Sequence, residues 1–257
     1  MNPPCLGGLA TALSFAAACP AATISQTFEA GEDTSNWGSS WSNGSTVPTF
    51  LSTTLGGQSA GGGASLTQSF SRSFKNNTAG LDLATAYTLS MYVQLDTFDG
   101  PAGGLFEIVD GDFGSGNAAN LRISTEETSP GIFAYHWQAR ANNSGWLDLG
   151  ITMDLASPYH VELAVDPVTF TYSAVVQAID PDGNVLGSGS LNNLAFDPNV
   201  INNHQNGTLL LYIQASSGGT DARIDNINIQ SVPEPSAVLM ASAAAATLAF
   251  ARRRRAA

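Results

Sequence analysis

Apolar and polar residues alternate along several stretches of the chain. Between Tyr87 and Asp96 every second residue is apolar, and the intervening positions carry polar side chains apart from Tyr92. Because successive side chains of a β-strand point to opposite faces, this period of two predicts a strand with one buried face. The same period recurs in three further stretches, 159–165, 170–178 and 209–215.

Residues that favour turns separate these predicted strands. Asp166-Pro167, Asp180-Pro181-Asp182-Gly183 and Ser216-Ser217-Gly218-Gly219 all combine Pro, Gly, Asp or Ser in short clusters. No stretch between them shows a convincing helical period. Many short strands joined by tight turns predict an all-β domain over residues 23–230, folded as an antiparallel β-sandwich.

The last predicted strand contains a break in its alternation. Ile224, Ile227 and Ile229 cannot all face the same way in a regular strand, because the first two are separated by an odd number of residues. A bulge at Asp225-Asn226 would restore the phase and bring all three to the core.

The charge and cysteine content narrow the classes of function. Charged residues make up 12% of the chain, and its formal net charge is −12. Four of the nine basic residues form the cluster 252–255, without which the charge is −16. A surface this acidic repels phosphate backbones, so we expect no nucleic-acid partner. Cys5 and Cys19 both precede the predicted domain, which therefore has no cysteine for a disulfide.

The first 22 residues are typical of a signal peptide. Residues 6–18 are apolar or small, and Cys19-Pro20-Ala21-Ala22 provides small residues for cleavage after Ala21 or Ala22. No Lys or Arg precedes the apolar stretch. Ala16-Ala17-Ala18-Cys19 leaves a lipoprotein cleavage site as an alternative, although Leu does not occupy its first position.

The C-terminal residues 231–257 have three parts. Pro233, Glu234 and Pro235 end the last strand, residues 236–251 form an uncharged, Ala-rich helical stretch, and a basic cluster follows. The cluster consists of Arg252, Arg253, Arg254 and Arg255, which would hold that end in the cytoplasm. A plain C-terminal membrane anchor is the alternative to a processed tail.

This tail resembles the PEP-CTERM sorting signal of Gram-negative bacteria. The resemblance implies that an exosortase recognises Pro233, Glu234 and Pro235 and cleaves close to them. The helix and the arginines would then anchor the protein in the inner membrane only for a time. It also implies export to the cell surface or extracellular matrix, in association with extracellular polysaccharide.

The domain between the two ends resembles the concanavalin-like jelly rolls, which include laminin-G-like and carbohydrate-binding modules. It begins with residues 24–29, ends with residues 222–229, and has an aromatic strand around Tyr135 and Trp137. The resemblance implies that the first and last strands lie side by side. It also implies a structural calcium ion held by Glu29 and Asp225, with Asp33 as a further ligand. The alternative is that Asp225 and Asn226 cap a turn of an edge strand.

The sequence matches known catalytic motifs only weakly, so we expect that the protein is not an enzyme. The segment from Glu107 to Asp112 is similar to that of laminarinase-type glycosidases, in which acidic residues at alternate positions face one sugar. Here Val109 and Gly111 follow Glu107 on its own face, whereas Asp110 and Asp112 belong to the other face. We interpret the segment as a core strand leading into an acidic turn. His136, His160 and His204 are scattered, which predicts residues on polar faces.

Tryptophans and asparagines point to carbohydrate as an alternative ligand. Trp137 shares the strand parity of other aromatic residues, so we expect it in the core, whereas Trp41 and Trp146 stand among Ser, Asn and Gly and are the better platforms for a sugar ring. The further candidates are Trp37 as a platform and Asn120, Asn142 and Asn143 as hydrogen-bonding partners. Three hypotheses follow: an exported matrix protein, a glycan-binding module, or a degenerate glycoside hydrolase.

Overall fold

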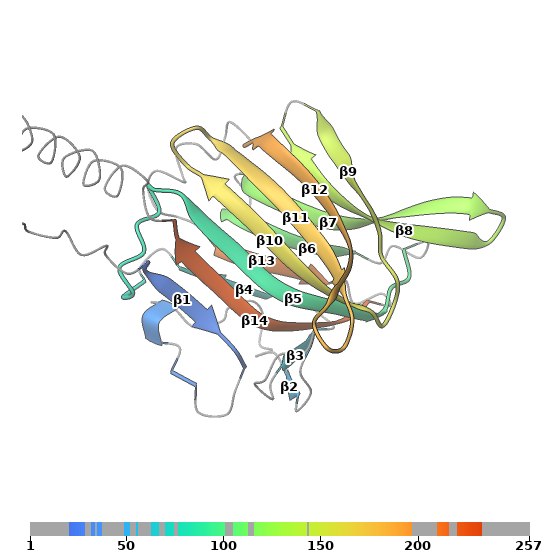
Figure 1. Ribbon diagram of the computed structural model, residues 1–257, viewed down its shortest axis with the longest axis horizontal. Helices are drawn as coiled ribbons and strands as arrows, with labels where there is room; N and C mark the ends of the chain where they lie inside the picture. Colours follow the sequence, from blue (N-terminus) through green and yellow to red (C-terminus); the bar gives the residue numbers. More distant parts are fainter. Residues whose placement is uncertain are drawn as a thin grey trace, which may run out of the picture. The chain divides into compact units, whose positions relative to one another are not determined.

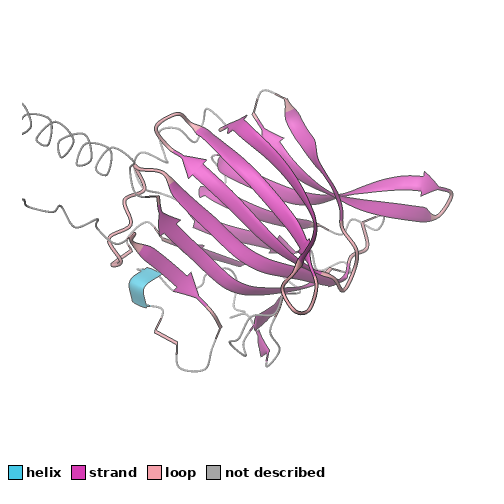
Figure 2. Cartoon of the chain, viewed as in Figure 1, coloured by secondary structure: helices cyan, strands magenta, loops and turns pink. Residues whose placement is uncertain are grey.

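Antiparallel β-strands make up most of the described chain, and they form two sheets (Figures 1 and 2). The computed structural model describes residues 21–28, 32–33, 35–37, 49–51, 55, 63–66, 70–74, 77–100, 105–112, 116–142, 144–196, 210–215 and 220–232, all within the unit Ala21–Val232. The following predicted features lie outside these residues: most of the leader, Pro233–Pro235, the apolar stretch 236–251, Arg252–Arg255, Glu29, Trp41, Asn143 and His204.

The larger sheet has eight strands in the order β12-β11-β10-β5-β14-β3-β2, with β1 also paired to β14. The period-two stretches of the sequence form its central strands. Its members are β1 (Thr23–Gln26), β2 (Thr49–Leu51), β3 (Gly63–Leu66), β5 (Tyr87–Thr97), β10 (Pro158–Asp166), β11 (Thr171–Ile179), β12 (Val185–Ala195) and β14 (Asp221–Ser231).

The smaller sheet has six strands in the order β4-β13-β6-β7-β8-β9. The β7–β8 hairpin is long and extends beyond the other strands of the two sheets (Figure 1). Its members are β4 (Phe70–Ser73), β6 (Phe106–Asp112), β7 (Gly116–Ser129), β8 (Ile132–Ala141), β9 (Gly145–Thr152) and β13 (Leu210–Ala215).

One hydrophobic core joins the inner faces of both sheets, which confirms the predicted antiparallel β-sandwich. The alternate residues of β5 and β10 are buried as the sequence predicts. Trp137 of the six-stranded sheet lies 5.7 Å from Tyr159 of the other sheet, measured between ring centroids. The hydroxyl of Tyr172 donates to the main-chain oxygens of Asn120 and Arg140 across the core. Aromatic contacts and hydrogen bonds therefore both connect the layers.

The first and last strands of the described unit lie side by side. Thr23 is in register with Gln230, and the antiparallel pairing continues to Gln26. The pairing of β14 with β5 shifts between Asp225 and Asn228, and Asn226 has a φ of 47°. Asn tolerates this left-handed conformation better than most residues. The predicted bulge is thus confirmed, and all three isoleucines of β14 are buried.

Strand β6 differs from the prediction made from its sequence. It continues through Asp112, so the predicted acidic turn is wrong. Asp110 lies fully buried in the core, where its Oδ2 accepts a 2.5 Å hydrogen bond from the hydroxyl of Tyr87. The hydroxyl partner allows a carboxyl group to occupy a position that the alternation assigns to the core.

The edges of the two sheets approach closely at β9 and β12. A Cβ atom on Gly189 would lie 2.3 Å from the main-chain oxygen of Leu149 and 2.8 Å from Cγ2 of Ile151. Glycine at this position therefore lets β12 pack directly against β9.

The three-residue 3₁₀-helix η1 (Ser35–Trp37) is the helical element of the described residues, and none of their helices has the length and apolar character of a membrane span.

Candidate functional site

The outer face of the six-stranded sheet carries a row of polar side chains across four strands. Glu107 of β6 is in register with Arg122 of β7, Arg122 with Gln138 of β8, and Gln138 with Asp148 of β9. Their sequence neighbours Ile108, Leu121, Ile123, Trp137, Ala139 and Leu149 are buried in the core. The alternation of the strands therefore directs these four residues, here called the polar row, away from the core.

Arg122 is held in place within the polar row. Its Nε and Nη2 atoms donate hydrogen bonds of 3.0 and 2.9 Å to Oε1 of Gln138. Its guanidinium group lies 4.0 Å from the ring centroid of Trp146, within the range of a cation–π interaction. Trp146 is half-buried and stands opposite Arg140 in the β8–β9 ladder. Trp146 and Arg140 thus extend the polar row into a wider surface.

Charges interact across this surface. Burial raises the pKa of Glu107, and the charges of Arg122 and Arg140 partly offset that effect. Burial also lowers the pKa of Arg122, against the opposing effect of Glu107 and together with that of Arg140. Glu107 and the two arginines are therefore close enough to influence one another's charge.

His136 stands between two carboxylates at one end of the surface. Its Nε2 lies 3.4 Å from Oε2 of Glu126, and its Nδ1 lies 3.5 Å from Oδ2 of Asp148. Nε2 makes no hydrogen bond to the described residues. The other oxygen of Asp148 accepts a 2.6 Å hydrogen bond from the main-chain nitrogen of Gly150. His136 confirms the expected polar-face position, and Asp148 connects it to the polar row.

We call this surface the polar face. It comprises Glu107, Arg122, Glu126, His136, Gln138, Arg140, Trp146 and Asp148.

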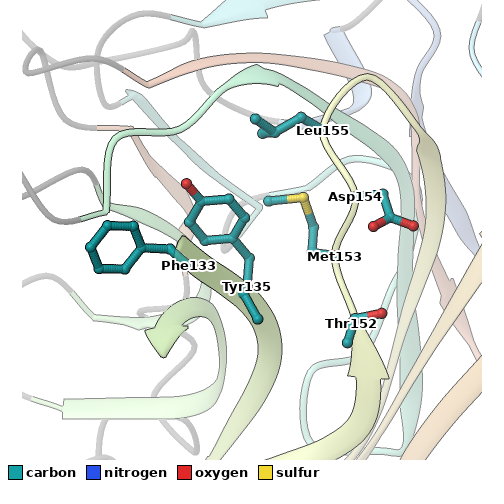
Figure 3. A pocket seen from close by; sticks show the side chains of 7 residues that line it. Phe133, Tyr135, Thr152, Met153, Asp154 and Leu155 are labelled. Carbon is teal, nitrogen blue, oxygen red and sulfur yellow. The ribbon is translucent and has the colours of Figure 1, made fainter. Parts of the chain in front are cut away.

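A pocket of about 380 Å³ lies between β8 and the loop that follows β9. Phe133 and Tyr135 share the strand face of the buried Trp137, so they line the pocket from the side of β8 opposite His136. Phe133 and Tyr135 lie side by side on β8, and the thioether of Met153 points toward Tyr135 (Figure 3). Asp154 and Leu155 lie farther along the loop that follows β9. The pocket thus has an aromatic wall on the core side of β8 and is separate from the polar face.

The tryptophans predicted as sugar platforms have different positions. Trp146 lies on the polar face, and Trp137 is fully buried as expected. Trp37 is also fully buried, beneath Arg72, whose guanidinium carbon lies 4.7 Å from its ring centroid. The suggestion that Trp37 is a platform is therefore wrong, because its indole nitrogen bonds to the Ser25 carbonyl within the fold.

The asparagines suggested as sugar partners also differ in their exposure to solvent. The side chain of Asn120 is buried, so it is not available at the surface. Asn142 is exposed at the start of the β8–β9 turn, one residue beyond β8 and four before Trp146. Asn142 is therefore accessible at the surface, as a sugar partner has to be.

Two of the three suggested calcium ligands, Asp225 and Asp33, lie within the described residues. Asp225 is fully buried at the bulge of β14, where its Oδ1 accepts a 2.7 Å hydrogen bond from the main-chain nitrogen of Asn226. Asp33 is exposed and accepts a hydrogen bond from the main-chain nitrogen of Ser35. Within the described residues, no three His, Cys, Asp or Glu side chains are grouped to hold a metal ion.

Glu32 has a structural role that the sequence does not indicate. Its carboxylate accepts hydrogen bonds from the Gln26 side chain and from the main-chain nitrogens of Thr27 and Phe28. Gln26 in turn accepts a 2.6 Å hydrogen bond from Arg72. Glu32 therefore fixes the chain just after β1.

Most residues of the polar row were not predicted from the sequence as members of one site. Polar residues at alternate positions of β7 and β8 provided a signal for an exposed face, but they do not reveal which residues stand opposite one another. Strand register, set by the β7–β8 hairpin and its bulge between Glu127 and Ser129, joins Arg122 to Gln138.

Comparisons with known proteins give structural likenesses at low sequence identity. No family model matches the sequence, and no curated protein sequence matches it. Peanut lectin is similar over 82% of this chain and 97% of its own, with a TM-score of 0.45 and 12% identity. A carbohydrate esterase from the Shiga toxin-encoding bacteriophage phi24B is similar over 80% of this chain and 99% of its own, with a TM-score of 0.48 and 11% identity.

The binding domain of botulinum neurotoxin serotype G is also similar. The match covers 80% of this chain, with a TM-score of 0.44 and 11% identity. This chain spans 46% of that domain's length. What the polar face binds must therefore be inferred from its own side chains.

Proposed function

We propose that this chain is an exported carbohydrate-binding protein whose glycan site is the polar face. The arrangement around Trp146 carries the proposal: a half-buried indole ring stands beside the hydrogen-bonded pair of Arg122 and Gln138. Arg122 covers one face of the indole ring, so the other face is the one that stacks on the apolar side of a sugar, and the neighbouring polar groups suit its hydroxyl groups. These groups are set on strands of a well-packed sandwich, which favours a preformed site.

We further propose that the sandwich is a concanavalin-like jelly roll. The adjacency of β1 and β14 supports this fold, as does a chain that passes repeatedly between the two sheets. In such a double sheet the faces turned away from the core remain available for ligands.

The proposed route to the exterior rests on the sequence of the two ends. The leader of residues 1–22 directs export, and an exosortase recognises Pro233-Glu234-Pro235. Residues 236–251 and the arginine cluster anchor the protein transiently in the inner membrane. The processed protein then reaches the cell surface or extracellular matrix, where it associates with polysaccharide.

We propose a binding role without catalysis. Glu107 and Asp110 occupy opposite faces of β6, since one lies on the polar face and the other in the core. Glu107 and Asp148 share the outer face but are three strands apart, which separates their backbones by about 14 Å. Glycosidase carboxyl groups lie roughly 5–10 Å apart. This spacing disfavours Glu107 and Asp148 as a pair of glycosidase carboxylates.

A glycan array tests the proposal with the full-length chain. Trp146→Ala should weaken glycan binding by about tenfold or more, because it removes the stacking surface. Tyr92→Ala is the matched control, since Tyr92 is a half-buried aromatic residue of the eight-stranded sheet that packs against His160, and it should bind as the parent does. Absence of binding to every glycan, including the exopolysaccharide of the source organism, would refute the proposal and favour a purely structural matrix role.

A further inference from the structure

The basic residues of the domain differ in the partners that their side chains contact. Apart from Arg252–Arg255 the chain has five, namely Arg72, Lys75, Arg122, Arg140 and Arg223. Arg72 is buried and donates to Gln26, and Arg223 forms a 2.5 Å ion pair with Asp96. Lys75 lies outside the described residues. The remaining two arginines, Arg122 and Arg140, both belong to the polar face.

These two arginines keep hydrogen-bond donors available. Nε and Nη2 of Arg122 donate hydrogen bonds to Gln138, whereas its Nη1 donates no hydrogen bond to the described residues. The exposed side chain of Arg140 likewise makes no hydrogen bond within the described part of the chain. Guanidinium groups present several N–H donors in a fixed plane. An external acceptor can therefore bind here without displacing an internal partner.

Two guanidinium groups of the polar face lie beside Trp146, those of Arg122 and Arg140. Glu107 is the acidic residue whose pKa responds to both Arg122 and Arg140, so one carboxylate faces two guanidinium groups. Asp148 and Glu126 lie instead beside His136. In a chain of net charge −12, these two arginines bring guanidinium groups to an indole ring on the surface of the sheet.

We infer that the polar face selects sugars that carry a carboxylate, that is, uronic acid units. This inference rests on the glycan site proposed above. Arg140 and the open Nη1 of Arg122 receive the carboxylate, and Trp146 stacks on the sugar ring. The planar guanidinium fork matches a carboxylate with two parallel hydrogen bonds, which a hydroxyl group does not offer. Recognition therefore depends on the acid group and not on the ring alone.

The ligand series isolates the carboxylate. Isothermal titration of the full-length chain uses an oligogalacturonate and the same oligosaccharide after reduction of its carboxyl groups to alcohols, at one fixed salt concentration. Dextran sulfate and dextran form a second pair that reports on anionic charge without a carboxylate. We expect the oligogalacturonate to bind about tenfold or more tightly than its reduced form, and dextran sulfate to bind no better than dextran.

The variants isolate the arginines. Arg140→Ala removes an exposed side chain, so it should leave the fold intact and abolish at least about nine-tenths of the affinity for oligogalacturonate. It should leave binding of the reduced form unchanged. Arg140→Lys keeps the charge and should recover binding in part, because the fork is lost. Arg223→Gln is the control, since it removes the same charge from the other sheet and should have no effect.

The outcomes distinguish failure of this inference from failure of the proposed function on which it rests. Equal affinity for the oligogalacturonate and its reduced form, with Arg140→Ala unchanged, would overturn uronate selection and leave glycan binding standing. Equally tight binding of dextran sulfate would overturn carboxylate recognition in favour of general anion binding. Failure of all four ligands, together with a glycan array without signal, would remove the proposed function itself.

Discussion

Replacing Asp110 by Asn should change how the stability of the sandwich depends on pH. The carboxyl group is fully buried between the sheets, and its Oδ2 accepts the Tyr87 hydroxyl at 2.5 Å. Oδ1 has no hydrogen-bond partner among the described residues. Burial raises the pKa of Asp110 from 3.8 to about 7, although the bond from Tyr87 acts in the opposite direction. The folded protein therefore retains a proton there that the unfolded chain has released.

The magnitude follows from this difference in proton affinity. Between pH 3.8 and about pH 7 the folded state binds more protons at this site than the unfolded state, so the free energy of unfolding falls as pH rises. Each pH unit within this window contributes about 1.4 kcal/mol. Between pH 5 and pH 8 the loss caused by Asp110 is therefore about 3 kcal/mol, because the effect levels off above pH 7.

Urea unfolding of parent and variant over this pH range measures the effect. The stability of Asp110→Asn relative to the parent should improve by about 3 kcal/mol from pH 5 to pH 8, since the amide does not ionise. Tyr87→Phe provides a second check, because loss of the hydroxyl should raise the pKa of Asp110 further and extend the decline above pH 7. A stability difference that stays constant with pH, or that grows toward low pH, would refute the reasoning.

Three further changes test other parts of the structure. Gly189→Ala should lower the free energy of unfolding by about 1–3 kcal/mol in urea titration, because the new Cβ would press against the Leu149 carbonyl; unchanged stability would show that the β9 and β12 edges are not in contact. Tyr172→Phe should cost about 1–3 kcal/mol, because two main-chain carbonyls of the opposite sheet lose their hydroxyl donor, and a thermal melt equal to that of the parent would contradict this role. The proposed calcium clamp between Glu29 and Asp225 predicts that EDTA lowers Tm and that added calcium restores it, whereas an unchanged Tm would exclude a structural calcium ion.

Alternation along individual strands was sufficient to predict the sandwich. Tyr87 to Leu95 and Tyr159 to Val165 are buried at every second position, as their pattern indicates. The bulge at Asp225 was predictable for the same reason, because three isoleucines of odd spacing need one residue out of phase. Both results depend on local sequence, where the requirement to bury apolar surface fixes which side of a strand faces inward.

The candidate site was less predictable because it depends on contacts between strands. Trp146 could be proposed from its Ser-, Asn- and Gly-rich surroundings, but its neighbour Arg122 is 24 residues away and on a non-adjacent strand. Trp37 had a comparable setting in the sequence and is buried by contacts with Arg72 and Ser25, which no local pattern shows. Register and long-range packing therefore decide which tryptophan can meet a ligand.

Strand β6 shows how one short segment serves two different requirements. Its outward residue Glu107 interacts with the arginines of the polar face, while its inward residue Asp110 is buried against Tyr87. The two carboxyl groups are three residues apart, and burial raises the pKa of both. Only the outward one can influence a bound glycan directly, because the sheet lies between Asp110 and the polar face. The pH dependence of folding and the selection of a ligand are thus assigned to opposite faces of the same strand, and Asp110→Asn should alter the first while leaving glycan affinity unchanged at pH 5, where both proteins are neutral at this position.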